Sequence, residues 1–154
     1  MSVVDYNGRT VDLAAYQGQE PGNVPLAMQL VGVGQSGRIL TGINKLSQRF
    51  LLELMTEEGT QANFPGRGCQ FMNDARTGVW QNTLDVFASF SASLVDITNN
   101  LNAEESDDDQ DDERFDTAEA SNVIFSRDFA SINIKITSRA GDSRQFIVPL
   151  DVPV

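Results

Sequence analysis

The sequence contains no histidine and only one cysteine, and these two shortages exclude common kinds of active site. Without histidine, the chain has no Ser-His-Asp or Cys-His catalytic pair, no His-ligated zinc and no usual proton shuttle near neutral pH. The lone Cys69 excludes an internal disulfide and a metal site built from cysteines alone. With no His to activate it, we expect Cys69 to be a packed thiol rather than a nucleophile. We therefore predict no catalytic residue and no cofactor.

Long apolar runs are also missing. No stretch approaches the 18 or more apolar residues of a membrane span, and the N-terminal MSVVDYNGRT has no charged region followed by an apolar one. We therefore expect no contact with a membrane and synthesis in the cytosol.

Positive charge is scarce, with 11 Lys and Arg against 22 Asp and Glu, which gives a net charge of −11. A nucleic-acid partner is not expected, because binding phosphates needs a basic surface. Nine of the acidic residues lie in EESDDDQDDERFD, residues 104–116, which we name the acidic segment. Charges at this density repel one another and resist packing, so we predict a solvated, mobile loop over residues 102–118.

The acidic segment partly matches a calcium-binding EF-hand loop. Asp107, Asp109 and Asp111 match the first three ligand positions, but Asp112 replaces the required Gly and Ala118 replaces the bidentate Glu. We prefer the solvated loop, and leave open a weak divalent-ion site or a contact with a basic partner.

Composition and periodicity predict an α+β fold in one domain, with two amphipathic helices on a small, mostly antiparallel sheet. Turn residues such as Pro21-Gly22 favour an extended N-terminal arm over residues 1–25, which could pack on the domain, residues 26–154, or on a partner. A short strand is predicted at 26–33, helices at about 42–58 and 83–101, and strands at 123–125, 132–137 and 144–148.

Polar residues accompany the apolar stripe of the first predicted helix. Lys45, Gln48 and Glu53 are placed on its open side, away from the core. Thr41 is the expected cap of this helix, and Thr83 that of the second.

Between the strand at 26–33 and the first helix stands GVGQSG, residues 32–37, which is a literal G-x-G-x-x-G. A dinucleotide site would need the helix to follow at once and a second strand ending in an acidic residue. Gly42 delays the helix, and the acidic residue at the right distance, Glu53, lies within it. A phosphate-binding P-loop also fails, because Arg38 and Ile39 stand where Lys and Ser or Thr are needed. We therefore interpret GVGQSG as a glycine-rich turn.

The segment TEEGTQANFPGRGC carries a resemblance to a known family. Gly59 is followed six residues later by Pro65, and then by Gly68 and Cys69. This resembles the G-E-R-x-x-x-P-x-x-G-C signature of the baseplate-wedge, or sheath-initiator, proteins of contractile phage tails, also called tail-lysozyme-like. A G-x-I turn at residues 37–39 and a V-P-L ending at residues 148–150 agree with the same family. The resemblance covers roughly residues 28–150; Thr60 and Gln61 replace the family's Glu-Arg, and the acidic segment lengthens one connection.

The resemblance implies a structural, non-enzymatic protein of the virion. Such proteins sit in the tail baseplate, assembled in the host cytoplasm in several copies, commonly six, and bind other wedge proteins and the tail sheath protein. They offer β-strands to the first sheath ring by β-augmentation, in which a partner strand pairs with a free sheet edge. The partner-binding residues implied here are Gly59, Pro65, Arg67, Gly68, Phe146, Ile147 and Val148.

The choice of machine stays open between a phage tail, a tailocin and a secretion system. The main alternative function is a regulatory protein-binding module of the same fold, like a bacterial anti-adaptor. An acidic mimic of nucleic acid and an enzyme are weaker alternatives.

Overall fold

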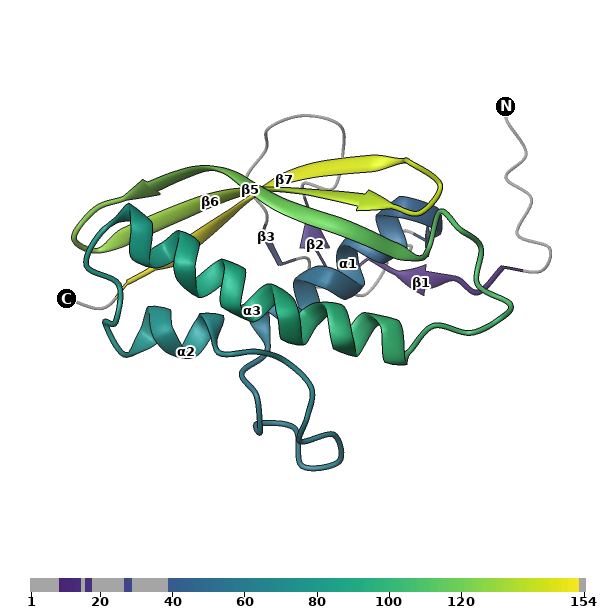
Figure 1. Cartoon of the computed structure of the whole chain (residues 1–154), viewed down its shortest axis with the longest axis horizontal. Helices are drawn as coiled ribbons and strands as arrows, with labels where there is room; N and C mark the ends of the chain where they lie inside the picture. Colours follow the sequence, from purple (N-terminus) through teal and green to yellow (C-terminus); the bar gives the residue numbers. More distant parts are fainter. Residues whose placement is uncertain (1–8, 15, 18–26, 29–38, 153–154) are drawn as a thin grey trace, which may run out of the picture.

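The C-terminal part of the chain forms a three-stranded antiparallel sheet in the order β5-β6-β7 (Figure 1). The structure is a computed structural model, which describes residues 9–14, 16–17, 27–28 and 39–152. Residues Ile132, Ile134 and Ile136 of β6 are buried, and the polar residues between them face the other side of the sheet. The strands are β5, Phe115–Phe125, β6, Phe129–Ser138, and β7, Ser143–Asp151.

Strand β5 starts earlier than predicted, inside the acidic segment. Its register against β6 shifts between Phe115 and Thr117 and again between Ala120 and Asn122. Each irregularity inserts a residue and reverses the alternation of sides. The period-two pattern is therefore visible only near residues 123–125, where we predicted the strand.

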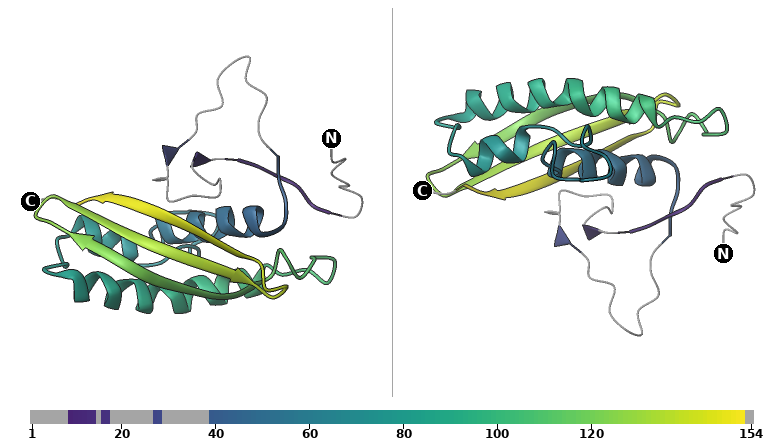
Figure 2. Two further views of the ribbon diagram at one scale, coloured as in Figure 1. Left: turned by 90° about the horizontal axis from the view of Figure 1, so that it is seen from above. Right: turned by 90° about the horizontal axis from the view of Figure 1, so that it is seen from below.

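Helices cover one face of the sheet and leave the other open to view (Figure 2). Helix α1, Gly42–Met55, contacts β6 and β7, and helix α3, Thr83–Ala103, lies against β5. The Phe50 ring stacks on Phe115 at 5.9 Å between ring centres and lies 6.5 Å from that of Phe90, which joins both helices to the sheet. The α+β prediction is confirmed, as are both predicted helices.

A third helix, α2, Phe71–Arg76, was not predicted. It buries Phe71 and Ala75, one turn apart, and six residues are too short to show a helical period in the sequence. The Phe71 ring lies 5.0 Å from that of Trp80 and 6.2 Å from that of Phe90. Helix α2 thus closes the core beside α3. Among the described residues, no helix has both the length and the apolar character to cross a membrane.

Both predicted helix caps differ from the structure. The side chain of Asn82, not Thr83, accepts hydrogen bonds from the backbone N–H groups of Leu84 (2.8 Å) and Asp85 (3.2 Å) at the start of α3. Thr41 occupies the cap position of α1 but makes no capping hydrogen bond with its side chain. A carboxylate distant in sequence, described below, takes that role.

The described part of the predicted arm packs on the domain. Strand β1, Asp12–Leu13, pairs with β4, Ile39–Leu40, and Gln48 of α1 donates to the Asp12 carboxylate at 2.8 Å. A second short pair joins β2, Tyr16–Gln17, to β3, Ala27–Met28, which is the described part of the strand predicted at 26–33. The GVGQSG turn lies outside the described residues.

Candidate interaction surfaces

Residues 56–69, which we name the finger, leave the end of α1 and project away from the body of the protein (Figure 1). The two sides of the finger meet in an isolated bridge between Glu57 and Cys69. Here the Cys69 N–H donates to the Thr56 carbonyl at 2.9 Å, and the Glu58 N–H donates to the Cys69 carbonyl at 3.3 Å. The motif that carries the family resemblance is therefore a closed loop with a hydrogen-bonded base.

A buried carboxylate of α1 fixes this base. Glu53 is only 2% exposed, and its Oε2 accepts from the Gly68 N–H and from the Asn100 side chain of α3, both at 2.9 Å. Its Oε1 pairs with the guanidinium of Arg67, which also pairs with Glu104 at the end of α3. Glu53 therefore ties the finger to two helices, contrary to its predicted place on the open side of α1.

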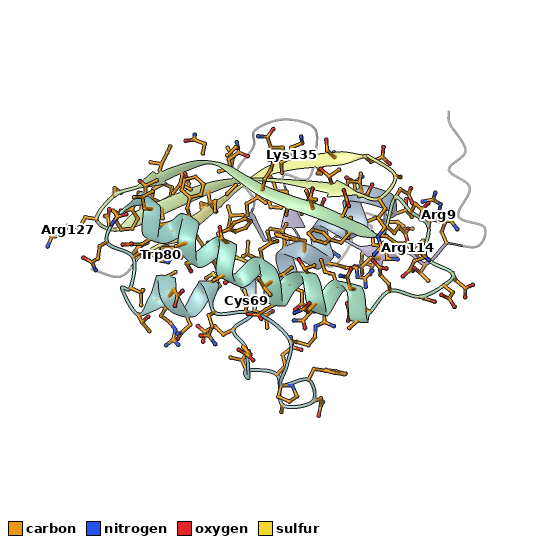
Figure 3. All side chains as sticks on the ribbon, in the orientation of Figure 1. Arg9, Cys69, Trp80, Arg114, Arg127 and Lys135 are labelled. Atoms are coloured by element: carbon orange, nitrogen blue, oxygen red, sulfur yellow. The ribbon has the colours of Figure 1, made fainter. Side chains whose placement is uncertain are left out.

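Gly68 is required at its position for steric reasons. Its φ is +89°, in the left-handed region, and a Cβ there would overlap the carbonyl oxygen of Thr56. Cys69 beside it is fully buried under α3 (Figure 3), and burial raises the pKa of its thiol above the ordinary value. The geometry fits the predicted packed thiol.

The predicted binding residues of the finger divide into two groups. Arg67 and Gly68 are engaged inside the protein, at the base, where they hold the loop in place. Gly59 and Pro65 lie in the exposed part, and the Gly59 N–H donates to the Pro65 carbonyl at 3.1 Å. The exposed part of the motif is therefore the most accessible to a partner, whereas Gly68 is buried and the guanidinium of Arg67 is already paired with Glu53 and Glu104.

In β7, the structure separates the three residues predicted to recognise a partner. Phe146 and Val148 are 1% and 2% exposed and belong to the core. Assigning side-chain recognition to these two residues is therefore wrong, because the strand alternates and turns them toward the helices. Ile147, between them, is partly exposed on the other face of the sheet.

The backbone of β7 has one side free of any described strand. Its pairing with β6 runs from Ser143 to Asp151 without a register shift, and the Val152 N–H continues it by donating to the Asp128 carbonyl at 3.1 Å. The backbone groups of successive residues point to opposite sides of a strand. Because those of Val152 point toward β6, those of Gln145, Ile147 and Pro149, each an odd number of residues away, point away from it. Pro149, which has no N–H, is tolerated at such a position.

The acidic segment is more firmly held than the sequence predicted. Glu113 is only 2% exposed; its Oε2 pairs with the Lys45 ammonium at 2.8 Å, and its Oε1 accepts from the Gly42 N–H at 3.1 Å. Lys45 also donates to the Thr10 hydroxyl of the arm. The loop is shorter than predicted, at residues 104–114, because α3 continues to Ala103 and β5 begins at Phe115.

Arg9 of the arm and Arg114 lie at the same end of the molecule (Figure 3). Arg9 donates to Asp112 at 2.9 Å, and this hydrogen bond is the main cause that raises the pKa of its guanidinium. The side chain of Arg114 donates to the Ser106 carbonyl at 3.1 Å. Together with Lys45, these two cations hold the segment in place. In the described part of the chain, no group of three or more acidic, His or Cys residues is placed to hold a metal ion.

Sequence reasoning missed Glu53, Glu113 and Lys45 as buried residues. Helical periodicity reports only which side chains are apolar, and α1 has the sheet on one side and the arm and finger base on another. The available signal was a charged residue in one segment and a glycine in the other: Glu53 of α1 with Gly68 of the finger, and Glu113 of the acidic segment with Gly42 of α1. It becomes specific only once the two are known to meet.

Comparisons of the chain with protein-family profiles, with curated proteins and with solved structures found no match in any of the three.

Proposed function

We propose that this chain is a structural protein of a contractile-tail baseplate, which docks on the wedge and offers the free edge of β7 to the first sheath ring. The sequence supports this through the order and spacing of the Gly59, Pro65, Gly68 and Cys69 motif and the V-P-L ending. The absence of histidine and the buried, high-pKa thiol of Cys69 argue for a non-enzymatic role.

The outer edge of β7, which pairs with no strand among the described residues, is the observation that carries the proposal. An edge strand presents a row of unpaired donors and acceptors to which another chain can add a strand. Strand β7 pairs with β6 in regular register, whereas the opposite edge, β5, is interrupted by two register shifts. Regular backbone spacing favours strand addition at β7, with Gln145 and Ile147 contributing the outward N–H groups.

The test replaces Ile147 with proline, which removes one outward donor and keeps the pairing with β6. Pro149 occupies the equivalent position two residues on, so Ile147→Pro is expected to fold. The full chain is co-expressed with candidate sheath and wedge proteins from the same genome. We expect Ile147→Pro to weaken sheath binding at least about tenfold, because one hydrogen bond is lost and the added strand is displaced.

Ile147→Val is the matched control, since it keeps the N–H and a branched side chain. Sheath binding by Ile147→Pro equal to that of Ile147→Val, with both variants folded, would exclude donation by β7. Binding to none of the tail proteins would exclude the baseplate role and favour the regulatory, anti-adaptor-like alternative.

A further inference from the structure

We propose that the tip of the finger, residues 59–66, inserts Phe64 into an apolar pocket on a neighbouring wedge protein. The inference rests on the proposed function and names the chemistry of the partner at the finger. It concerns a residue outside the set expected from the motif.

The tip differs from the rest of the surface in charge. In a chain of net charge −11, its sequence GTQANFPG contains no charged residue, and all eight of these residues are exposed. Phe64 is 63% exposed, which is high for a large aromatic side chain. The centres of protein interfaces are depleted in charge and enriched in aromatic residues, as this tip is.

The backbone of Phe64 is held in place by successive turns. Its N–H donates to the Gln61 carbonyl at 3.1 Å, and its carbonyl accepts from the Arg67 N–H at 3.0 Å. The Thr60 N–H donates to the Glu57 carbonyl at 3.2 Å on the outgoing side of the finger. Because the base is fixed to Glu53, binding through Phe64 requires little further ordering of the loop.

The composition of the tip selects a protein pocket as the partner surface. A nucleic acid would need cations beside the aromatic ring, and a membrane surface would need several apolar residues with Lys or Arg around them. The tip offers one aromatic side chain and, within four residues of it in the sequence, the uncharged polar groups of Thr60, Gln61 and Asn63. That arrangement suits an aromatic anchor in an apolar pocket with a hydrogen-bonding rim.

The experiment measures binding of the purified full-length chain to each candidate wedge protein from the same genome, by titration calorimetry. We expect Phe64→Ala to weaken binding to one of them at least about 30-fold, the effect of removing an interface anchor. Asn63→Asp should weaken the same binding at least about tenfold, because it places a carboxylate against the pocket. Asn99→Asp, which adds the same charge on the exposed side of α3, should bind within about threefold of wild type.

Protection of the Cys69 thiol from a disulfide reagent shows that the finger base is intact in each variant. Unweakened binding by Phe64→Ala, with sheath binding still sensitive to Ile147→Pro, overturns this inference alone. Equal effects of Asn63→Asp and Asn99→Asp overturn the apolar pocket. A wild-type chain that binds no tail protein removes the proposed function, and this inference with it.

Discussion

The finger and the acidic segment are attached to α1 by similar contacts, but the helix provides the carboxylate in the first case and the loop provides it in the second. In the finger, the buried carboxylate is Glu53 of α1, and the loop provides the N–H of Gly68 and the cation of Arg67. In the acidic segment, the loop provides the buried carboxylate, Glu113, and α1 provides a glycine N–H and a lysine. Both glycines have positive φ. The two bases are thus alike.

The exposed parts beyond these bases are opposite in character. The finger ends in eight uncharged residues, whereas residues 107–111 of the acidic segment contain four aspartates. Composition indicates what kind of partner each exposed part suits, but it gives no information on whether the base is fixed. The sequence therefore predicted the solvated aspartates but not the burial of Glu113 beside them.

The largest difference between the two bases is expected on removal of the carboxylate charge. Glu113→Gln leaves the Lys45 ammonium, whose side chain is 9% exposed, without its carboxylate, and should lower the free energy of unfolding by about 3 to 4 kcal/mol. Glu53→Gln should lower it by about 2 kcal/mol, because Arg67 is 30% exposed and retains Glu104. Denaturant titration at neutral pH measures both.

Glu119→Gln is the control, because it breaks only the exposed ion pair with Lys135 and should leave the denaturation midpoint unchanged. A loss for Glu53→Gln equal to or greater than that for Glu113→Gln would contradict the ranking of the two bases.

The next smaller difference in stability is expected when each of the two glycines is replaced by alanine. Gly68→Ala must move the backbone of Thr56 and should lower the free energy of unfolding by about 3 kcal/mol. Gly42→Ala meets the Asp112 carboxylate at 2.9 Å, which is on a side chain that can shift, so the expected loss is about 1 to 2 kcal/mol.

Gly59→Ala serves as the reference for backbone strain alone. It has a φ of +82° with nothing within 4 Å of a Cβ, and should lose about 1 kcal/mol. Thermal and denaturant unfolding measure all three variants. If Gly68→Ala matched Gly59→Ala, the close approach to Thr56 would not matter for stability.

The smallest expected effect is a loss of stability at alkaline pH that comes from the finger base and has no counterpart in the acidic segment. Burial raises the pKa of Cys69, so the folded protein keeps this proton at pH values where the unfolded chain has released it. The resulting stabilisation is complete below the ordinary thiol pKa and is lost as the pH rises through the folded-state pKa. Between the ordinary thiol pKa and the folded-state pKa, the free energy of unfolding of the wild type should fall, relative to Cys69→Ala, by up to about 1.4 kcal/mol per pH unit.

Parallel denaturant titrations of both proteins at several alkaline pH values measure this difference. The two proteins differ only at residue 69, so contributions from all other groups cancel in the comparison. A constant difference across the range would mean that the thiol is not shielded in the folded state.

The parts of the fold that the sequence predicted are those with a strong local period. Helices α1 and α3 and strands β6 and β7 place apolar residues on one side at regular spacing, so their positions follow from the pattern alone. Helix α2 and the beginning of β5 lack such a pattern. The first is too short, and the second is interrupted by its register shifts.

The attachment of the loops was beyond prediction from a local pattern. Lys45 and Glu113 are 68 residues apart, and Gly68 and Glu53 are 15 apart. A polar residue on a helix gives the same sequence signal whether it faces water or a carboxylate brought from far along the chain. The motif drew attention to the residues of the finger, but only the structure shows that Arg67 and Gly68 make contacts with Glu53 at its base.

Pro149 also bears on the association of this protein with copies of itself. An uninterrupted edge would let one molecule add to the next without limit, as in the growth of a fibril. Because Pro149 offers no N–H on the outward side of β7, an added strand could form a complete ladder of hydrogen bonds along residues 143–148 but would lack one donor at Pro149. Among the described residues nothing pairs with this edge, and Pro149 limits the uninterrupted pairing that any added strand could make there to a short stretch.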